Sequence, residues 1–348
     1  MVKIGINGFG RIGRLAFRVA TMNHSSDAEI AVINTSGSMS ASGWMMLVKY
    51  DTNFKRYPFE ISAEDVKNPK EATDEDPLIG YIIVQGKKYP VLAQKNPEKI
   101  PWGGYGVDVV IESTGVFIDT KGASGHFVGG AKKVVLSAPA KGDDIPTYVL
   151  GVNQTGGEKI ISNASCTTNC ISPVTKVIMS NFGIQKAMMT TIHSFTDDQR
   201  LHDNSHKDLR RARAAGQNIV PTTTGAAVAT GLVIPEIVGK FDGIAIRVPT
   251  PAGSVSDITF LTEKDTTVEE VNKVLTEAAN KPEFAGILAV TSDPLVSSDI
   301  IGQTYSAIVD LEFTQVVGGN MVKVLAWYDN EWGYTNRLVE QAILAAGL

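Results

Sequence analysis

A glycine-rich turn near the N-terminus constrains the fold of this chain more than any other feature. Gly8-Phe9-Gly10-Arg11-Ile12-Gly13 follows an apolar run from Lys3 to Asn7 and opens a helical pattern that ends near Met22. Glycines at this spacing between a strand and a helix are typical of a dinucleotide-binding βαβ unit. We expect the helix N-terminus to hold a pyrophosphate, although the same pattern also occurs as a plain tight turn in α/β proteins.

The first third of the chain continues to alternate short β-branched runs with helical patterns. Further strands are predicted at Glu29 to Asn34, Asp108 to Ser113 and Lys133 to Ser137, which favours a Rossmann-type, doubly wound parallel sheet. Between Tyr50 and Trp102 the sequence becomes polar and proline-rich, with an acidic run at Glu71, Asp74, Glu75 and Asp76. We interpret this region as loops and edge strands, with the acidic run solvated.

The pattern changes after Cys166. A long apolar helix is predicted from Thr167 to Asn181, followed by longer alternating runs such as Phe241 to Val248, Ser254 to Leu261 and Met321 to Trp327. Alternation of this kind predicts a mixed or antiparallel sheet. The 348 residues therefore divide into a dinucleotide-binding domain at 1–165 and an α+β catalytic domain at 166–330, with a C-terminal helix at 331–348 packing back on the first domain.

Composition excludes several classes of protein. The 32 basic and 37 acidic residues give a net charge of −5, which argues against nucleic acid or an anionic membrane as the main partner. No stretch approaches the roughly 18 apolar residues of a membrane helix. Both cysteines fall in one short segment, so we expect free thiols in a reducing compartment, with the cytoplasm as the default. His202 and His206 lack a third ligand, so we expect no metal.

Cys166 is the main candidate nucleophile. Ser165 is a plausible N-cap that places the thiol in the first turn of a helix, where unpaired N–H groups and the helix dipole favour a thiolate. Cys170, one turn further along, is interpreted as a small buried side chain. His193, at the end of an apolar strand, could serve as the base, but from the residues alone a lone histidine there is more often structural.

Hydroxyl and guanidinium groups suited to phosphate oxygens cluster in the second half of the chain. They are Thr167, Thr168, Thr196, Thr222, Thr223 and Thr224 with Gly225, and Arg247. The densest basic run, Lys207 to Arg213, is interpreted as a solvated face or a subunit contact rather than a nucleic-acid site.

The end of the second strand carries information about the cofactor. An acidic residue normally accepts hydrogen bonds from the ribose 2′-hydroxyl at this point, but here the strand ends in Asn34-Thr35-Ser36-Gly37. A carboxylate would repel a 2′-phosphate, whereas an amide and two hydroxyls can donate to one. The residues at the end of this strand are therefore compatible with either NAD or NADP as the cofactor.

Taken together, motifs along nearly the whole chain closely resemble the phosphorylating glyceraldehyde-3-phosphate dehydrogenase family. The motifs are INGFGRIGR at the start, ESTGVF at 112–117, SAPAK at 137–141, ASCTTNC at 164–170, HKDLRRARAA at 206–215, PTTTGAA at 221–227, RVPTP at 247–251 and WYDNEWGY at 327–334. ASCTTNC is far more specific than the glycine loop, and the resemblance turns His193 into the expected base.

The resemblance implies oxidation of glyceraldehyde 3-phosphate through a thioester on Cys166, with inorganic phosphate cleaving the thioester to 1,3-bisphosphoglycerate. It places the substrate phosphate near Thr196 and Arg247. It places the attacking phosphate near Ser165, Thr167, Thr224 and Gly225. The cofactor residues it implies are Gly8, Gly10, Arg11, Ile12, Gly13, Asn34, Thr35, Ser113, Thr114, Ser137, Ser205, Asn330 and Tyr334.

Two departures from the family pattern bear on cofactor choice. Asn34 stands where members that prefer NAD carry an acid, and Asn204-Ser205 replaces a Leu-Pro pair that the family supplies from a neighbouring subunit near the adenosine ribose. We therefore predict use of NADP alongside NAD, or a preference for it. The family also implies a homotetramer.

Two alternatives remain open at this stage. An erythrose-4-phosphate dehydrogenase could keep the same thiol, base and cofactor fold. A dinucleotide-binding, RNA-binding or adhesion protein is disfavoured by the complete pair of Cys166 and His193.

Overall fold

Two large sheets organise the chain, one in each of two units. The computed structural model describes residues 1–154 and 157–347; unit 1 comprises 1–148, 157–164 and 335–347, and unit 2 comprises 149–154 and 165–334. Positions 155 and 156, within the predicted first domain, and Leu348, the last residue of the predicted terminal helix, lie outside the described residues. No helix among the described residues is long and apolar enough to cross a membrane.

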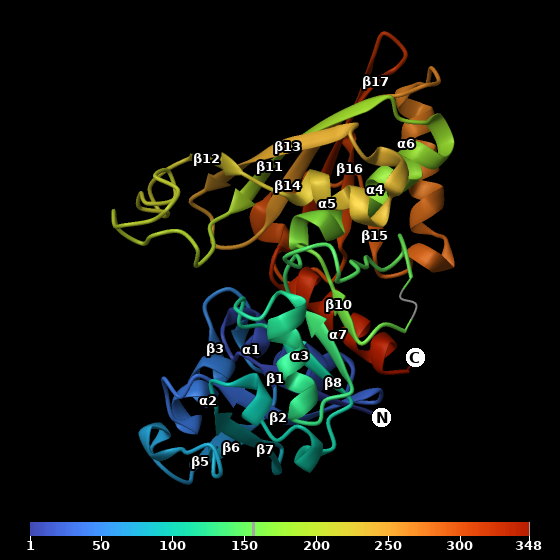
Figure 1. Ribbon diagram of the computed structural model, residues 1–348. Helices are drawn as coiled ribbons and strands as arrows, with labels where there is room; N and C mark the ends of the chain where they lie inside the picture. The colour runs from blue at the N-terminus through green and yellow to red at the C-terminus, as the bar shows by residue number, and fades with distance from the viewer. Residues whose placement is uncertain (155–156, 348) are drawn as a thin grey trace. The chain divides into compact units, whose positions relative to one another are not determined.

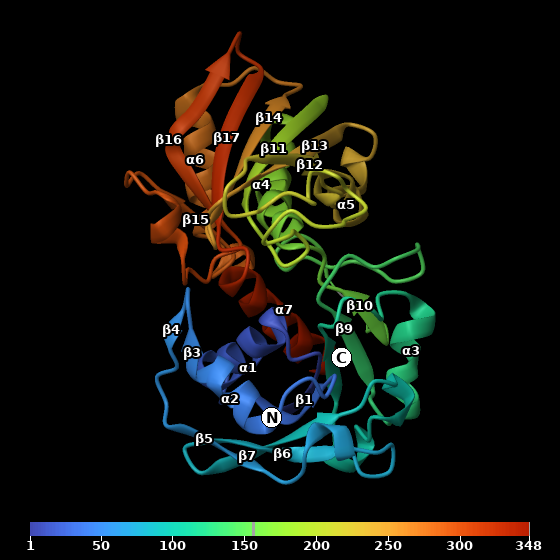
Figure 2. The same cartoon turned by 90° about the vertical axis from the view of Figure 1, so that its left-hand side faces the viewer.

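Unit 1 contains an eight-stranded sheet with the order β10-β9-β8-β1-β2-β7-β6-β5 (Figures 1 and 2). Pairing is parallel from β10 to β7 and antiparallel from β7 to β5. This sheet confirms the predicted Rossmann-type fold. The strands are β1 (Val2–Asn7), β2 (Ala28–Thr35), β5 (Ile61–Asp65), β6 (Leu78–Val84), β7 (Lys87–Ala93), β8 (Val109–Glu112), β9 (Lys133–Leu136) and β10 (Ile160–Ser162).

Helices pack on this sheet along its length. Helix α1 (Arg11–Asn23) contacts β1 and β2, α2 (Ala41–Lys49) contacts β5 and β6, and α3 (Thr120–Val128) contacts β9 and β10. Helix α7 (Trp332–Gly347) begins in unit 2, and its residues from Thr335 onward belong to unit 1, where Asn336 accepts a hydrogen bond from Asn23. A small hairpin, β3 (Tyr50–Asp51) and β4 (Lys55–Arg56), and short 3-10 turns at Pro69–Glu71, Pro97–Lys99 and Gly103–Tyr105 complete the unit.

The central strand β1 is buried on both faces, as parallel strands between two helical layers are. Ile4 and Ile6 are fully buried, and Gly5 between them lies under the indole of Trp102. A Cβ atom at Gly5 would lie 2.6 Å from that ring, so only glycine fits there. Trp102 is itself fully buried.

The region from Tyr50 to Trp102 is more ordered than predicted. β5 is an edge strand, as predicted, but β6 and β7 lie inside the sheet, and β7 pairs parallel with β2. The four acidic residues are exposed, as predicted, and two of them also have partners: Asp74 accepts hydrogen bonds from Gln94 and Lys99, and Asp76 pairs with Lys67. Proline and charge obscured these strands because Pro90 stands within β7 and charged residues flank the hairpin.

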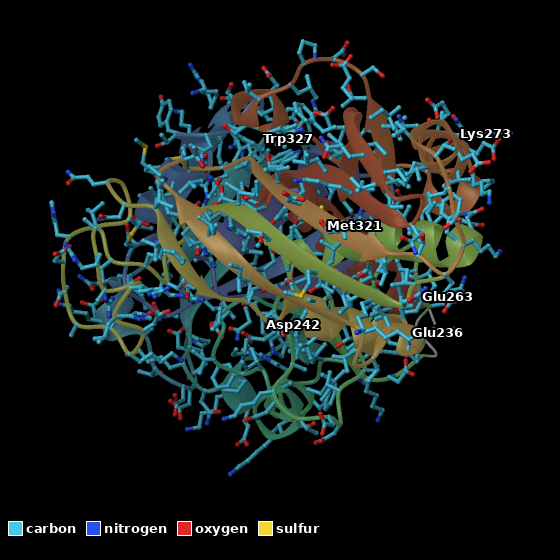
Figure 3. All side chains as sticks on the ribbon, turned by 90° about the horizontal axis from the view of Figure 1, so that it is seen from above. Glu236, Asp242, Glu263, Lys273, Met321 and Trp327 are labelled. Atoms are coloured by element: carbon cyan, nitrogen blue, oxygen red, sulfur yellow. The ribbon has the colours of Figure 1, made fainter. Side chains whose placement is uncertain are left out.

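Unit 2 is built on a seven-stranded mixed sheet with the order β12-β13-β11-β14-β17-β16-β15. Helix α4 (Cys166–Phe182) contacts β14, β16 and β17, and also α5 (Ala226–Val233) and α6 (Val268–Ala279). Figure 3 shows strands of this sheet in view, with Asp242, Met321 and Trp327 labelled on them. The strands are β11 (Lys186–Ser194), β12 (Val220–Thr223), β13 (Phe241–Val248), β14 (Ser254–Leu261), β15 (Leu288–Thr291), β16 (Ala307–Val317) and β17 (Met321–Tyr328), with 3-10 turns at Pro235–Ile237, Pro282–Phe284 and Ser297–Ile300.

The carboxylate of Asp51 ties the β3–β4 hairpin to α1. It accepts hydrogen bonds from the Arg11 guanidinium and from the backbone N–H groups of Asn53 and Phe54. Burial opposes its charge, but the Phe54 and Arg11 hydrogen bonds outweigh burial and lower the pKa of Asp51. A carboxyl whose pKa is lowered by folding stabilises the protein above its unfolded pKa, and this stabilisation is lost as pH falls through the folded pKa.

We expect Asp51→Asn to lower the free energy of unfolding at pH 7 by about 1–3 kcal/mol, because the Arg11 guanidinium loses its charged partner. The difference from the natural protein should shrink as pH falls below about 4. Urea unfolding from pH 7 to pH 3 measures both effects. The control Asp76→Asn breaks an exposed pair with Lys67 and should cost less than about 1 kcal/mol; a loss at Asp51 that did not change with pH would contradict the assignment.

Candidate active site and dinucleotide pocket

Helix α4 presents Cys166 as its first residue. The Ser165 side chain accepts a hydrogen bond from the Thr168 N–H at 3.0 Å and caps the helix, as predicted. Ala164, immediately before the cap, has a φ of 56°, a left-handed conformation that is rare for a residue with a Cβ atom. Cys170 lies one turn deeper and is fully buried.

Strand β11 brings His193 to this thiol. The Cys166 Sγ atom lies 3.4 Å from His193 Nε2, and His193 Nδ1 lies 2.6 Å from the carbonyl oxygen of Ser194. Nδ1 also lies 3.2 Å from Arg247 Nη1, which can only donate, but the carbonyl contact is much shorter and a carbonyl can only accept. The shorter contact assigns the proton to Nδ1, so that Nε2 turns its lone pair toward the sulfur. The imidazole is therefore oriented to accept the thiol proton.

Burial acts against the thiolate that the helix N-terminus favours. It raises the pKa of the Cys166 thiol, and the Arg247 guanidinium lowers that pKa only in part. Burial also lowers the pKa of His193 to about 3, with a further lowering by Arg247. Desolvation therefore favours a neutral thiol and a neutral imidazole, in opposition to the helix N-terminus.

Arg247 belongs to the same cluster because of strand register. In the parallel pairing of β11 with β13, His193 is opposite Arg247. The Arg247 Nη1 atom donates to Thr196 Oγ1 at 2.8 Å, whereas its buried Nε has no hydrogen-bond partner among the described residues. The Thr196 hydroxyl itself donates to Asp198, so the free donor of this cluster is the Nε of Arg247, and a guanidinium with a free donor is suited to a phosphate group.

The hydroxyls of four predicted threonine donors already form hydrogen bonds within the protein. Thr168 and Thr222 are used within the fold, by Ser165 and Asp208 respectively. Thr167 shares a 2.9 Å hydrogen bond with the buried Tyr328 hydroxyl, which also contacts Thr191. Thr224 and Gly225 precede the first turn of α5, and the Thr224 hydroxyl accepts from the Ala226 N–H.

Asn330 is a buried amide with an unused donor. Its Oδ1 accepts from the Ser254 hydroxyl at 3.0 Å, while its Nδ2 has no partner among the described residues. A buried N–H without a partner is unfavourable, so Asn330 fits a ligand with a carbonyl oxygen, such as the nicotinamide carboxamide. Tyr334 lies four residues further along, inside α7, and is also buried.

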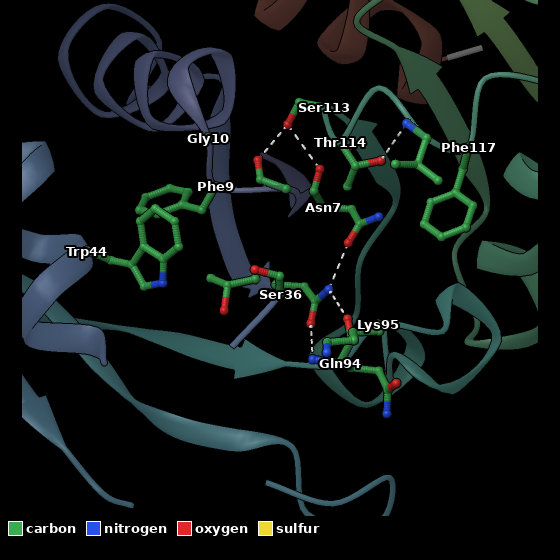
Figure 4. Close-up of a pocket in the computed structure, with 14 residues that line it drawn as sticks. Asn7, Phe9, Gly10, Ser36, Trp44, Gln94, Lys95, Ser113, Thr114 and Phe117 are labelled. Carbon is green, nitrogen blue, oxygen red and sulfur yellow. Dashed lines mark hydrogen bonds between the residues drawn. The ribbon is translucent and has the colours of Figure 1, made fainter. Parts of the chain in front are cut away.

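Unit 1 contains a cavity of about 440 Å³ at the carboxyl ends of β1, β2 and β8 (Figure 4). Of the predicted cofactor residues, Gly8, Gly10, Asn34, Thr35, Ser113 and Thr114 line it. Phe9, Ser36, Trp44, Gln94, Lys95, Val116 and Phe117 line it as well, with Asn7. No aspartate or glutamate is among these lining residues.

Arg11, Ile12, Gly13 and Ser137 are not part of this lining. Arg11 instead pairs with Asp51. A Cβ atom at Gly13 would lie 2.0 Å from the Gly8 carbonyl oxygen, so its role is the close approach of helix and turn. The Ser137 N–H donates to the Glu112 carbonyl between neighbouring strands.

Asn34 is not available as a donor to a ribose or its phosphate. Both amide hydrogens are used, by Asn7 Oδ1 at 2.7 Å and the Gln94 carbonyl at 2.8 Å, and the side chain is buried. The Thr35 hydroxyl is likewise occupied by the Leu92 carbonyl. The exposed side chains at this part of the pocket are Ser36 and Lys95.

Ser205 and the basic run lie in unit 2. Ser205 is exposed, and its carbonyl accepts from Arg200. Within the run, Arg211 pairs with Asp198 and Asp208, and Arg213 pairs with Asp203. Nearby acids therefore neutralise much of the basic run.

Sequence reasoning missed several polar groups that shape both sites. In unit 2 these are Ser254 and Tyr328, and in unit 1 they are Asn7, Trp44 and Glu112. Asn7 and Glu112 end consecutive parallel strands of the sheet, and polar residues at that position were an available signal.

The fold and the two sites together define a dinucleotide-dependent oxidoreductase. Residues 2–120 match the model of the glyceraldehyde 3-phosphate dehydrogenase NAD binding domain, and residues 165–330 match that of the C-terminal domain. The chain belongs to the glyceraldehyde-3-phosphate dehydrogenase family, and it is an NAD(P)-dependent enzyme.

Similar proteins come from bacteria and algae. The chain is 50% identical over 347 residues to glyceraldehyde-3-phosphate dehydrogenase of Streptomyces coelicolor, covering 98% of each chain. It is 49% identical over 349 residues to that of Geobacillus stearothermophilus, covering 99% of this chain and 98% of the relative. It is 50% identical over 330 residues to the chloroplastic glyceraldehyde-3-phosphate dehydrogenase A of Scenedesmus vacuolatus, covering 94% of this chain and all of the relative.

Proposed function

We propose that the protein oxidises glyceraldehyde 3-phosphate with NAD(P)+ and inorganic phosphate to 1,3-bisphosphoglycerate through a thioester on Cys166. The observation that carries this proposal is the 3.4 Å contact between Cys166 Sγ and the lone pair of His193 Nε2. Unit 1 serves as the dinucleotide-binding domain and unit 2 as the catalytic domain, with the terminal helix assigned to unit 1.

The reaction begins when the sulfur of Cys166 attacks the aldehyde carbon and His193 Nε2 takes the thiol proton. The aldehyde oxygen takes that proton back from His193 Nε2, which gives the hydroxyl of a hemithioacetal and leaves the imidazole neutral again. His193 then removes the hydroxyl proton while the carbon loses a hydride, leaving a thioester. The bound nicotinamide supplies the hydride acceptor, and Asn330 and Tyr334 are the residues proposed to hold its ring.

Phosphate completes the cycle. An oxygen of inorganic phosphate attacks the thioester carbon, and the sulfur of Cys166 leaves and recovers its proton. Donors at Ser165, Thr167, Thr224 and Gly225 are proposed to bind this phosphate. The free Nε of Arg247 and the Thr196 hydroxyl are proposed to bind the phosphate of the substrate.

We expect formation of reduced cofactor from glyceraldehyde 3-phosphate to require phosphate, and Cys166→Ser to lower kcat by about 1,000-fold or more, because a hydroxyl is a far weaker nucleophile than a thiol. Absorbance of the reduced nicotinamide measures both. Cys170→Ala is the matched control, because Cys170 is fully buried, and it should keep kcat within about threefold.

Turnover that is independent of phosphate would contradict cleavage of the thioester by phosphate, and full activity of Cys166→Ser would contradict the thioester itself. Faster turnover of erythrose 4-phosphate than of glyceraldehyde 3-phosphate would instead favour the alternative substrate.

Both cofactors are proposed to bind, with NADP at least comparable to NAD. Asn34 does not support this proposal, because both of its amide hydrogens are used within the protein. The support comes from the residues that line the pocket. The pocket lacks a lining carboxylate and includes the Ser36 hydroxyl, the Lys95 ammonium and the buried indole N–H of Trp44, which has no partner among the described residues. Figure 4 shows Trp44 and Ser36 on the same side of the pocket. Ser205 remains a proposed contributor from a neighbouring subunit.

We expect kcat/KM with NADP+ to lie within about tenfold of that with NAD+ or above it, and a value about 1,000-fold lower would contradict the proposal. Ser36→Asp should lower the NADP+ value at least about tenfold more than the NAD+ value, because the new carboxylate repels a 2′-phosphate. Ser38→Asp adds the same charge outside the pocket lining and should leave the ratio unchanged. Equal losses with both cofactors in Ser36→Asp would contradict the assignment of this end of the pocket.

A homotetramer in the cytoplasm is also proposed. Large apolar side chains are exposed on the unit 2 sheet, among them Met188, Ile244 and Phe313, at 64%, 49% and 53% exposure, and such patches mark protein contacts. Sedimentation equilibrium should give four chains per particle, and a monomer would contradict the proposal.

The two cysteines are free thiols, as expected in a reducing compartment.

A further inference from the structure

Glu112, the last residue of β8, is a buried carboxylate that the reaction does not use. It is 1% exposed, and it accepts four hydrogen bonds. Asn7 Nδ2 donates at 2.5 Å, the Thr114 N–H at 2.8 Å, and the Thr114 hydroxyl and His126 Nε2 supply the others. Both carboxylate oxygens are therefore occupied.

The donors around Glu112 are uncharged. The indole N–H of Trp102 can only donate, so His126 Nδ1, 3.1 Å from it, must accept. His126 is consequently the neutral tautomer with its proton on Nε2, where it donates to Glu112. A buried carboxylate held by dipoles alone needs every one of them, because each missing hydrogen bond leaves charge unsolvated.

Two of these donors come from the two loops that form the pocket. Asn7 precedes the glycine turn after β1, and Thr114 lies in the loop after β8; both line the cavity, whereas Glu112 does not. The two loops are in close backbone contact, because a Cβ atom at Gly8 would lie 2.8 Å from the Thr114 nitrogen. Glu112, which lies outside the cavity lining, therefore links the two loops through its hydrogen bonds with Asn7 and Thr114.

The connection continues across the sheet. Asn7 Oδ1 accepts from Asn34, whose own Oδ1 accepts from the backbone N–H of Gln94, and Figure 4 shows this sequence of hydrogen bonds. The carboxyl ends of β8, β1 and β2 and the segment after β7 are linked in one network. Its only charged member among these residues is Glu112.

We propose that Glu112 is a positioning residue for dinucleotide binding, which sets the separation and orientation of the β1 and β8 loops without touching the cofactor. Glutamine at this position would offer one acceptor oxygen and turn an NH2 group toward groups that are themselves donors. At least one of Asn7, Thr114 and His126 would lose its partner, and the loops would lose their common anchor.

The test compares Glu112→Gln with Asp108→Asn. Asp108 precedes the same strand at its opposite end, where it accepts from the Lys3 N–H and Lys132, so it reports general loosening of unit 1. Isothermal titration with NAD+ should give a Kd raised about tenfold or more for Glu112→Gln. The Kd of Asp108→Asn should stay within about twofold of the natural protein.

Two further readouts separate positioning from damage. The rate at which iodoacetamide alkylates Cys166 should be unchanged in Glu112→Gln, because the thiol belongs to unit 2. The KM for NAD+ should rise while kcat at saturating NAD+ stays within about threefold. An unchanged Kd in folded Glu112→Gln, or an equal rise in Asp108→Asn, would overturn the proposal.

His126→Leu keeps the test decisive if Glu112→Gln does not fold. It removes one donor to Glu112 at a residue that is fully buried and does not line the pocket. We expect a Kd for NAD+ raised about three- to tenfold. His126→Gln, whose amide can both accept from Trp102 and donate to Glu112, should restore most of the affinity, and the absence of any effect in His126→Leu would also overturn the proposal.

Discussion

The close approach of bare backbone at the start of α1 is the constraint on which unit 1 depends. Gly13 has no room for a side chain above the Gly8 carbonyl, and Gly8 has none beside the loop that follows β8. Helix, turn and loop can therefore come together only where side chains are absent. This contact brings Asn7 and Thr114 within reach of one carboxylate and leaves the cavity above them open to a ligand.

In unit 2 the positions of the site residues are set by strand register rather than by glycines that allow close backbone contact. Parallel pairing of β11 and β13 sets His193 opposite Arg247, and the serine cap fixes Cys166 at the first turn of α4. Burial favours the neutral forms of the thiol and the imidazole, in opposition to the helix N-terminus. The permanently charged guanidinium of Arg247 lies beside this pair.

The sequence was most informative where periodicity and local rules govern. The bounds of β13 and β14, the cap at Ser165 and the buried position of Cys170 were all predicted, because alternation, capping and apolarity are readable residue by residue. The predictions missed that β6 and β7 lie inside the sheet, and the predicted role of Asn34 as a donor to the cofactor was wrong. Hydrogen bonds between residues far apart in the chain decide both, and no pattern along the sequence specifies which buried amide satisfies which carbonyl.

Helix α7 has a consequence for how the protein is made. Its residues from Thr335 onward belong to unit 1, and Leu338, Val339 and Ala342 on it are fully buried. A ribosome synthesises these residues after all of unit 2. Unit 1 therefore cannot complete its core as it emerges, although domains commonly fold in order of synthesis. Its apolar surface stays exposed until α7 has been made, and loss of α7 should damage the part of the protein that was made first.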